Sequence, residues 1–190
     1  LSGNGLGDFT NTGGTIQALD SSEVQLIINA SIIGGTLTTA GTGVIRANSG
    51  QNVFLTDLTN AGDFQVDNNS ELGLSGTINN TGSITSTSTG QLTEIKIQAG
   101  GATLTGGGTV TLVGASGNAR INASSTGERL INLDNTIQGQ GQIGQGSAAI
   151  TNQAAGLIDA NVDGETLTLN PVTTATDGDD EFINLGTVQA

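Results

Sequence analysis

A seven-residue phrase recurs along this chain and limits what the chain can fold into. It reads apolar, any residue, Asn or Gly, any residue, Gly, any residue, apolar. Clear copies are LTNAGDF (58–64), INNTGSI (78–84), LTGGGTV (104–110) and IQGQGQI (137–143). Looser copies are FTNTGGTI (9–16), LTTAGTGVI (37–45), ITNQAAGLI (150–158) and INLGTV (183–188). Such repetition predicts a repeat protein in which each copy adds one similar structural unit.

The phrase predicts a strand, a tight corner and a second strand. Asn or Gly at the third position accepts the left-handed backbone of a sharp bend, and Gly does so without steric cost. Because equivalent residues of stacked units lie above one another, Asn60 and Asn80 are expected to form an internal amide ladder. The predicted corner residues are Asn11, Asn60, Gly62, Asn80, Gly82, Gly106, Gly108, Gly139, Gly141 and Asn152.

Alternation of apolar and polar residues predicts a third strand in most units. These strands are expected at 23–28, 52–57, 71–76, 93–99, 129–134 and 165–170. Residues two apart in a strand point to the same side, so the apolar ones should face inward. The predicted core consists of Ile16, Leu26, Ile45, Leu55, Phe64, Leu74, Ile84, Ile97, Val110, Leu133, Ile143, Ile158 and Leu167.

The pattern predicts an all-β fold, a parallel β-helix of about seven irregular three-strand coils stacked at about 4.8 Å. The second anchors fall at 16, 45, 64, 84, 110, 143, 158 and 188, so their spacing varies from 15 (143 to 158) to 33 (110 to 143). We expect loops outside the coil, chiefly 113–128 and 171–181, to absorb this variation and to offer places for recognition. Residues 1–190 then form one domain, a segment of a longer protein or a stackable filament subunit. An antiparallel β-sandwich is the alternative, which explains the alternation but not the repeated corner.

Composition excludes several classes of function. The chain of 190 residues has a net charge of −13 and contains no Cys, Met, Trp, Tyr or His. Such a surface repels phosphate backbones and anionic lipid headgroups, so we expect no nucleic acid as partner and no binding to a membrane surface. No stretch approaches the ~20 apolar residues of a spanning helix, so we expect no membrane insertion. The lack of Cys excludes a disulfide scaffold, a thiolate zinc site and a Cys nucleophile. We therefore predict no cofactor, with calcium as the one candidate discussed below.

The chain resembles large secreted bacterial surface proteins, namely filamentous-haemagglutinin-like exoproteins, autotransporter passengers and giant adhesins. The resemblance lies in TNAGDFQVDNNSELGLSGTINNTGSI (59–84), ATLTGGGTVTLVG (102–114), LINLDNTIQGQGQIGQG (130–146) and ITNQAAGLIDANV (150–162). It implies a right-handed β-helix that is secreted or held at the bacterial cell surface, with a structural role in adhesion or biofilm. We expect a rigid adhesin shaft or a self-assembling filament unit. Its partners would be identical copies or flanking segments, stacked end to end, and host or matrix glycans or proteins.

An acidic run near the C-terminus is the one candidate metal site. It gathers Asp177, Asp179, Asp180 and Glu181 in an expected loop. Closely spaced carboxylates take up Ca²⁺, but this spacing matches neither the EF-hand loop nor the nonapeptide repeat of calcium-binding β-helices. A solvated acidic loop is the alternative interpretation.

Ice binding is an alternative function, because it requires a flat β-face with ranks of outward Thr. Beside the first anchors lie Thr36, Thr38, Thr59, Thr77, Thr103, Thr105, Thr136 and Thr151. Other residues interrupt this column at Asp57, Asn79, Gln138 and Ala149. Thr is also simply a favourable outward residue in a strand.

A polysaccharide-active enzyme is the less favoured alternative function. Such an enzyme would need paired carboxylates and usually aromatic side chains on which the sugar rings pack. The only aromatic residues are Phe9, Phe54, Phe64 and Phe182, and we expect Phe54 and Phe64 to fill the core. The basic residues Arg46, Lys96, Arg120 and Arg129 are scattered. The sequence therefore predicts no catalytic residues and a protein that is not an enzyme.

Overall fold

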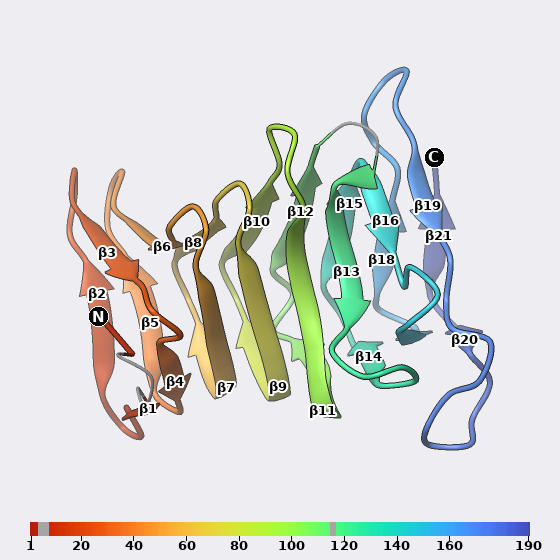
Figure 1. The fold of residues 1–190 in the computed structure, drawn as a ribbon, viewed down its shortest axis with the longest axis horizontal. Coiled ribbons are helices and arrows are strands. Elements are labelled where there is room, and N and C mark those ends of the chain that lie inside the picture. Colours follow the sequence, from red (N-terminus) through yellow and green to blue (C-terminus); the bar gives the residue numbers. More distant parts are fainter. Residues whose placement is uncertain (4–7, 115–116) are drawn as a thin grey trace.

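The computed structural model describes residues 1–3, 8–114 and 117–190, which fold into a parallel β-helix (Figure 1). Every pair of strands is parallel, and the described residues contain no α-helix. Over the described residues, eight strands follow one another on each of three faces, so that seven steps separate the first coil from the last. The two termini lie at opposite ends of the long axis (Figure 1). The predicted β-helix is confirmed, and the antiparallel sandwich is wrong.

Each coil places one strand on each face, and we number faces 1 to 3 and coils 1 to 8 in chain order. Face 1 contains β1 (Asp8–Thr10), β4 (Ser31–Ile33), the first halves of β7 (Asn52–Asn60), β9 (Glu71–Asn80) and β11 (Thr93–Thr105), then β13 (Ala119–Ala123), β16 (Gly141–Ile143) and β19 (Leu167–Leu169). Face 2 contains β2 (Thr15–Ala18), β5 (Thr36–Thr39), the second halves of β7, β9 and β11, then β14 (Arg129–Asn132), β17 (Ala149–Asn152) and β20 (Phe182–Asn184). Face 3 contains β3 (Glu23–Leu26), β6 (Val44–Ala47), β8 (Asp63–Val66), β10 (Ser83–Thr87), β12 (Thr109–Val113), β15 (Thr136–Gly139), β18 (Leu157–Asp159) and β21 (Thr187–Gln189).

A continuous column of aliphatic side chains fills the interior. Alternation selects its members, so that in β7 Val53 and Leu55 are buried while Phe54 points outward. Ile16 and Leu167 are only partly buried, because they lie in the end coils and a single neighbouring coil covers them. Of the predicted core residues, those at most 1 % exposed are Leu26, Ile45, Leu55, Phe64, Leu74, Ile84, Ile97, Val110, Ile143 and Ile158.

One predicted core residue is misplaced, because Leu133 is 43 % exposed. The corner from Leu130 to Ile137 holds one residue more than the seven-residue phrase. The inward positions therefore belong to Leu130, which pairs with Ile150, and to Ile137, which pairs with Ile158. Alternation alone could not reveal the extra residue, since Leu133 keeps the expected spacing from its neighbours.

Two of the predicted second anchors lie on other faces. Ile16 lies in β2 on face 2, and Ile143 lies in β16 on face 1. Val24 and Ile137 hold the corresponding positions of face 3. The short spacing from Ile143 to Ile158 is therefore not a coil, and the true coils are more regular than the sequence suggested.

Some predicted corners and third strands also belong to different edges of the helix. Asn11 lies in the turn from face 1 to face 2, between β1 and β2. Gly139 and Gly141, with φ of 108° and 142°, form the bend from face 3 to face 1. The predicted third strand at 23–28 forms β3 on face 3, and the one at 129–134 forms β14 on face 2. Every sharp bend favours Asn or Gly, so residue type does not identify the edge.

A ladder of buried Asn side chains runs inside the corner between faces 2 and 3. Asn60 Nδ2 donates to Asn80 Oδ1 at 2.8 Å, as predicted. Further along, Asn132 donates to Asn152 at 2.9 Å, and Asn152 donates to Asn184 at 2.9 Å. All except the terminal Asn184 are fully buried. Because a buried amide without partners is costly, each Asn fixes its neighbours in register.

Coil 5 has no Asn in this corner, and Asn135 of coil 6 replaces it. Asn80 Nδ2 donates to Asn135 Oδ1 at 2.9 Å, past Gly106 and Gly108. A Cβ atom at Gly106 would lie 2.7 Å from the Asn80 carbonyl oxygen, and one at Gly108 would lie 2.8 Å from Asn80 Nδ2. The two glycines therefore leave the space through which the bond passes. Within coil 6, the Asn135 N–H donates to Asn132 Oδ1 at 3.0 Å, which joins the two parts of the ladder.

The ladder ends at coil 2, where Leu37 lies beside Asn60 in register. Asn60 Oδ1 is buried and has no hydrogen-bond partner among the described residues. The physical reason is that a hydrocarbon side chain has no N–H to donate.

Candidate functional site

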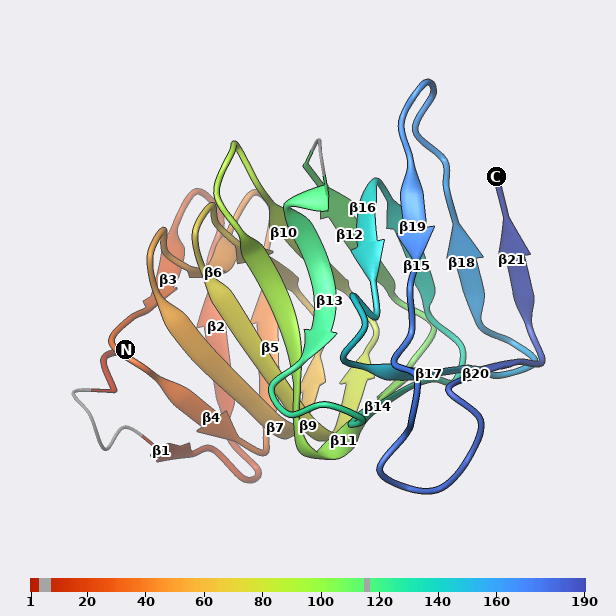
Figure 2. The same ribbon diagram turned by 45° about the vertical axis from the view of Figure 1, so that its right-hand side comes forward.

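Residues 171–181, which we call the strap, depart from the coil pattern between β19 and β20. The strap is the blue loop at the lower right of Figure 2. It folds back on coils 6 and 7, where Val172 N–H donates to Ala148 at 2.9 Å and Thr176 N–H donates to Gly127 at 3.0 Å. Val172 also packs against Ala149. The predicted loop therefore lies outside the coil but is held against it. The other predicted loop, 113–128, is wrong in part, because β13 occupies residues 119–123 of it and pairs with β11 on face 1. Ala115 and Ser116 lie outside the described residues.

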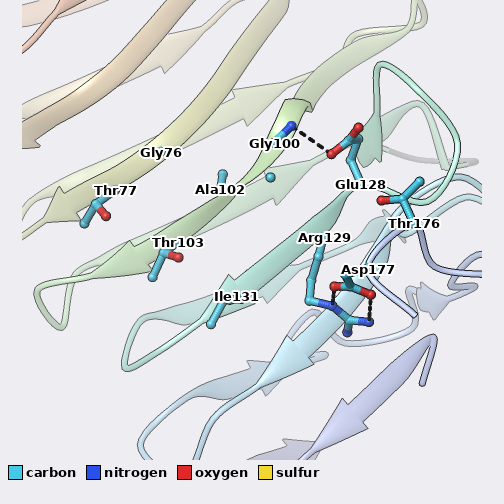
Figure 3. Close-up of a pocket in the computed structure, with 11 residues that line it drawn as sticks. Gly76, Thr77, Gly100, Ala102, Thr103, Glu128, Arg129, Ile131, Thr176 and Asp177 are labelled. Atoms are coloured by element: carbon cyan, nitrogen blue, oxygen red, sulfur yellow. Dashed lines mark hydrogen bonds and ion pairs between the residues drawn. The ribbon is translucent and has the colours of Figure 1, made fainter. Parts of the chain in front are cut away.

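An ion pair between Arg129 and Asp177 fastens the strap (Figure 3). The Arg129 side chain is only 7 % exposed, and its Nε and Nη2 both donate to the Asp177 carboxylate. Nη1 donates to Thr151 Oγ1 at 2.9 Å, and Nη2 also donates to the Asp180 carbonyl at 2.8 Å. The hydrogen bonds from Arg129 lower the pKa of Asp177 to about 2, and the same pair raises the pKa of Arg129.

The acidic run that was a candidate metal site is organised around this ion pair. Asp177 also accepts a hydrogen bond from the Asp179 N–H at 3.1 Å. Within the described ranges, no three acidic side chains are grouped as a metal ion requires. Calcium binding by Asp179, Asp180 and Glu181 stays a prediction, and Asp177 is already engaged by Arg129.

A groove runs along face 2 beside the strap. One cavity of about 370 Å³ lies against the strap, and a second of about 330 Å³ lies nearer the N-terminus. Both are lined by Thr77, so they adjoin. We call the two together the strap groove, and its defining residues are Asp57, Thr59, Thr77, Thr103, Ile131 and Asp177.

Outward side chains of successive coils form the floor of the strap groove. Thr77 pairs with Thr103, and Thr103 pairs with Ile131, so the three lie in a row about 4.8 Å apart (Figure 3). In the neighbouring column, Asn79 Nδ2 donates to Thr59 Oγ1 at 3.3 Å. The floor therefore presents hydroxyl and amide groups at the coil spacing and becomes apolar at Ile131.

Two carboxylates on the rim of the groove are held by backbone N–H groups. Asp57 Oδ1 accepts from the Thr77 N–H at 2.8 Å, and Glu128 Oε2 accepts from the Gly100 N–H at 2.9 Å (Figure 3). At Gly76, with φ of 65°, an added Cβ would collide with the Asp57 carboxylate. Glycine at this bend thus lets Asp57 reach the next coil. Each of these two carboxylates keeps a second oxygen that can accept another hydrogen bond.

The predicted Thr column is only partly realised. Thr36, Thr38, Thr59, Thr77, Thr103 and Thr105 lie in strands of face 2. Asn79 and Ile131 interrupt them, Thr136 lies on face 3, and Thr151 is buried under Arg129. The column is therefore too irregular to form an extended hydroxyl surface.

Face 3 carries a second hydroxyl array that sequence reasoning missed. Ser83, Thr109 and Thr136 are in register, as are Thr85 and Thr111. The signal was present in the segments SITST (83–87) and TVTLV (109–113), where hydroxyl and inward residues alternate. These residues flank the second anchors Ile84, Val110 and Ile137, whereas the predicted Thr column lies beside the first anchors.

Aromatic residues lie differently from the prediction. Phe64 is in the core, but Phe54 points outward on face 1 and covers its register partner Gly73. A Cβ at Gly73 would collide with the Phe54 ring, so the glycine makes room for it. Phe9 and Phe182 are partly buried in the end coils.

Three of the four basic side chains form ion pairs among the described residues. Arg46 contacts Glu23 at 3.1 Å and Asp67 at 3.3 Å on face 3. Lys96 contacts Glu71 at 2.7 Å and Glu94 at 3.2 Å on face 1. Glu94 lies in the same strand as Lys96, whereas Glu23, Asp67 and Glu71 belong to neighbouring coils. With Arg129 paired to Asp177 of the strap, these contacts leave little cationic surface.

Comparison of the chain with profiles of known protein families, with characterised proteins and with solved structures finds no match. Over the described residues, no helix is long and apolar enough to cross a membrane.

Proposed function

We propose that this chain is a non-enzymatic, rigid structural segment of a protein exported to the bacterial surface, where it acts as the shaft of an adhesin or as a filament unit. One observation supports the proposal most: three parallel ladders share a single core along the whole rod. Strand pairing is directed along the axis at every step, so that each described coil is hydrogen-bonded directly to the next.

The buried amide ladder adds resistance to sliding. Moving one coil relative to the next would separate Asn60 from Asn80, and Asn132 from Asn152. Each separation would leave a buried polar group without a partner, at about 1–3 kcal/mol. Stiffness of this kind suits a part that holds other parts at a fixed distance.

Spin labels measure this rigidity directly, because the native chain has no Cys. We expect cysteines replacing Gln25 and Gln189, both on face 3, to give one narrow distance distribution near about 34 Å, which is seven coil steps. A broad distribution would contradict the proposed shaft. Release of reducing sugar from a panel of polysaccharides would contradict the non-enzymatic role.

End-to-end stacking is the proposed mode of assembly. In the part of the chain that the structure describes, β19, β20 and β21 each pair on one side only. An open strand edge accepts a further strand, supplied by an identical copy or by a flanking segment. Because the chain is strongly acidic, association of copies should strengthen with salt, and sedimentation at low and high salt tests it. A sedimentation coefficient independent of both salt and concentration would exclude stacking of identical copies.

Binding of ordered water is the second candidate, favoured by the array on face 3. Thr85 and Thr111 are neighbours across two coils, and Thr109 and Thr136 continue a parallel column. We expect ice crystals grown with the protein to become faceted, and a T85V/T111V variant to lose the effect. Unmodified crystals at high protein concentration would remove this candidate.

A further inference from the structure

The strap groove combines an elongated shape, a polar floor and a folded insertion that closes one end. Insertions that leave a repeat scaffold commonly form its recognition surface. Here the insertion is packed and held by Arg129 and Asp177, so the wall it forms is already built in the free protein. We infer that the strap groove binds one chain of a neutral polysaccharide, laid along the axis of the β-helix. Polysaccharide binding would be a second role beside the mechanical one, and experiments can contradict either role without contradicting the other.

The shape favours a polymer over a compact ligand. The two cavities adjoin at Thr77 and extend from Gly35 in coil 2 to the strap. Their floor presents a hydroxyl or amide group at each of coils 3, 4 and 5, with Thr59 beside Asn79 and Thr77 beside Thr103. A ligand with its own repeating units can therefore make similar contacts at successive coils.

The chemistry of the lining matches sugar hydroxyl groups, which both donate and accept. Thr77 and Thr103 hydroxyls do both, and the free oxygens of Asp57 and Glu128 accept. Ile131 supplies an apolar surface for the C–H groups of a ring. None of the residues that line the two cavities is aromatic, so we expect weak binding that depends on several hydrogen bonds at once.

The charge of the groove selects a neutral chain. Its one cation, Arg129, is neutralised by Asp177, and the remaining ionised groups in the lining are Asp57 and Glu128. A phosphate, sulfate or uronate polymer would meet uncompensated negative charge.

An extended peptide fits less well, because its recognition would use backbone hydrogen bonds. Peptides that extend a sheet need a free strand edge. The floor of the groove is the face of a sheet, and the strands beneath it are paired on both sides. The groove floor therefore offers no strand edge that a peptide could extend.

Native electrophoresis through gels that contain a polysaccharide tests the inference. The neutral probes are dextran, galactomannan and mixed-linkage β-glucan, the anionic probe is polygalacturonate, and casein serves as a protein probe. The test variant is T77V/T103V, which removes two hydroxyls but keeps the shape of the groove floor. The matched control is T85V/T111V, an equivalent register pair from the same two coils on face 3.

We expect at least one neutral polysaccharide, but not polygalacturonate or casein, to retard the protein. The apparent Kd should rise about tenfold in T77V/T103V and stay unchanged in the control, because two hydrogen bonds to the ligand are lost. Retardation by none of the three neutral probes, by casein instead, or equal weakening in both variants would overturn the inference. The spin-label distance between coils is measured on the same protein, so failure of the groove and failure of the shaft are told apart.

Discussion

Asn80 and Asn135 are 55 residues apart in the sequence, yet their side chains form a buried hydrogen bond of 2.9 Å that passes over an entire coil. The bond exists because coil 5 has Gly106 where coils 3 and 4 have Asn, and because coil 6 has Asn135 where the neighbouring coils 5 and 7 have Gly. Asn135 of coil 6 thus closes the gap that coil 5 leaves in the amide ladder.

Replacing Asn135 by Ala should destabilise the protein by about 1–3 kcal/mol, because Asn80 loses its amide acceptor inside the core. The backbone bond from Asn135 to Asn132 remains. Urea denaturation measures the change, and the exposed Asn161, also replaced by Ala, is the control. Equal losses in the free energy of unfolding for the two variants would show that the bond across coil 5 does not stabilise the protein.

Substitutions of Gly106 and Gly107 by Ala distinguish the cost of a steric clash from the cost of a positive φ. Both have positive φ, 102° and 70°, but only Gly106 has atoms close to an added Cβ. We expect G107A to cost about 1 kcal/mol from conformation alone and G106A distinctly more. Thermal unfolding of the two variants gives the comparison, and a smaller loss in G106A would contradict it.

Leu130 and Leu133 test the register of coil 6. Leu130 is 1 % exposed and Leu133 is 43 % exposed. Leu130→Ala should lower the free energy of unfolding by about 2–5 kcal/mol, whereas Leu133→Ala should change it by less than about 0.5 kcal/mol. If the larger loss fell on Leu133, the original alternation pattern would be right and the register described here wrong.

The strap should loosen only in strong acid. The folded-state pKa of Asp177 is about 2, below its ordinary value of 3.8, so the ion pair stabilises the strap fully above the ordinary value. That contribution is lost as the pH falls through about 2. Amide chemical shifts of Thr176 and Gly178, followed by NMR, should show this midpoint.

The variant D177N should lack the transition and have a looser strap at neutral pH, while D179N should keep both. A midpoint near 3.8 in the native protein would mean that Arg129 does not hold the carboxylate.

The fold was largely predictable because stacking makes the same physical demand in every coil. Leu55, Phe64 and Ile84 alternate with polar neighbours, and a Gly/Asn bend follows at a fixed distance. The pair Asn60 and Asn80 followed from the same logic, since stacked corners bring identical side chains together. Local patterns were less informative about which edge a bend occupies, as Asn11 and Gly139 show.

The candidate site was much harder to foresee. The contact of Arg129 with Asp177 joins residues 48 apart through a loop without periodic pattern. Thr77 and Thr103 are neighbours because of the register between their two strands. Later in the chain, the extra residue between Leu130 and Ile137 shifts this register relative to the sequence pattern. Outward residues have no core to constrain them, so periodicity shows only that they point outward.

The four hydrogen bonds between Asn side chains in the column from Asn60 to Asn184 all run, from donor to acceptor, toward the C-terminal side. Aligned peptide dipoles add along a helix, and the side-chain amides here are aligned in the same way. The interior of the rod is therefore electrically polar, with its positive end toward coil 8, while the chain as a whole has a net charge of −13. Two such rods brought together end to end would meet unlike poles in only one relative orientation.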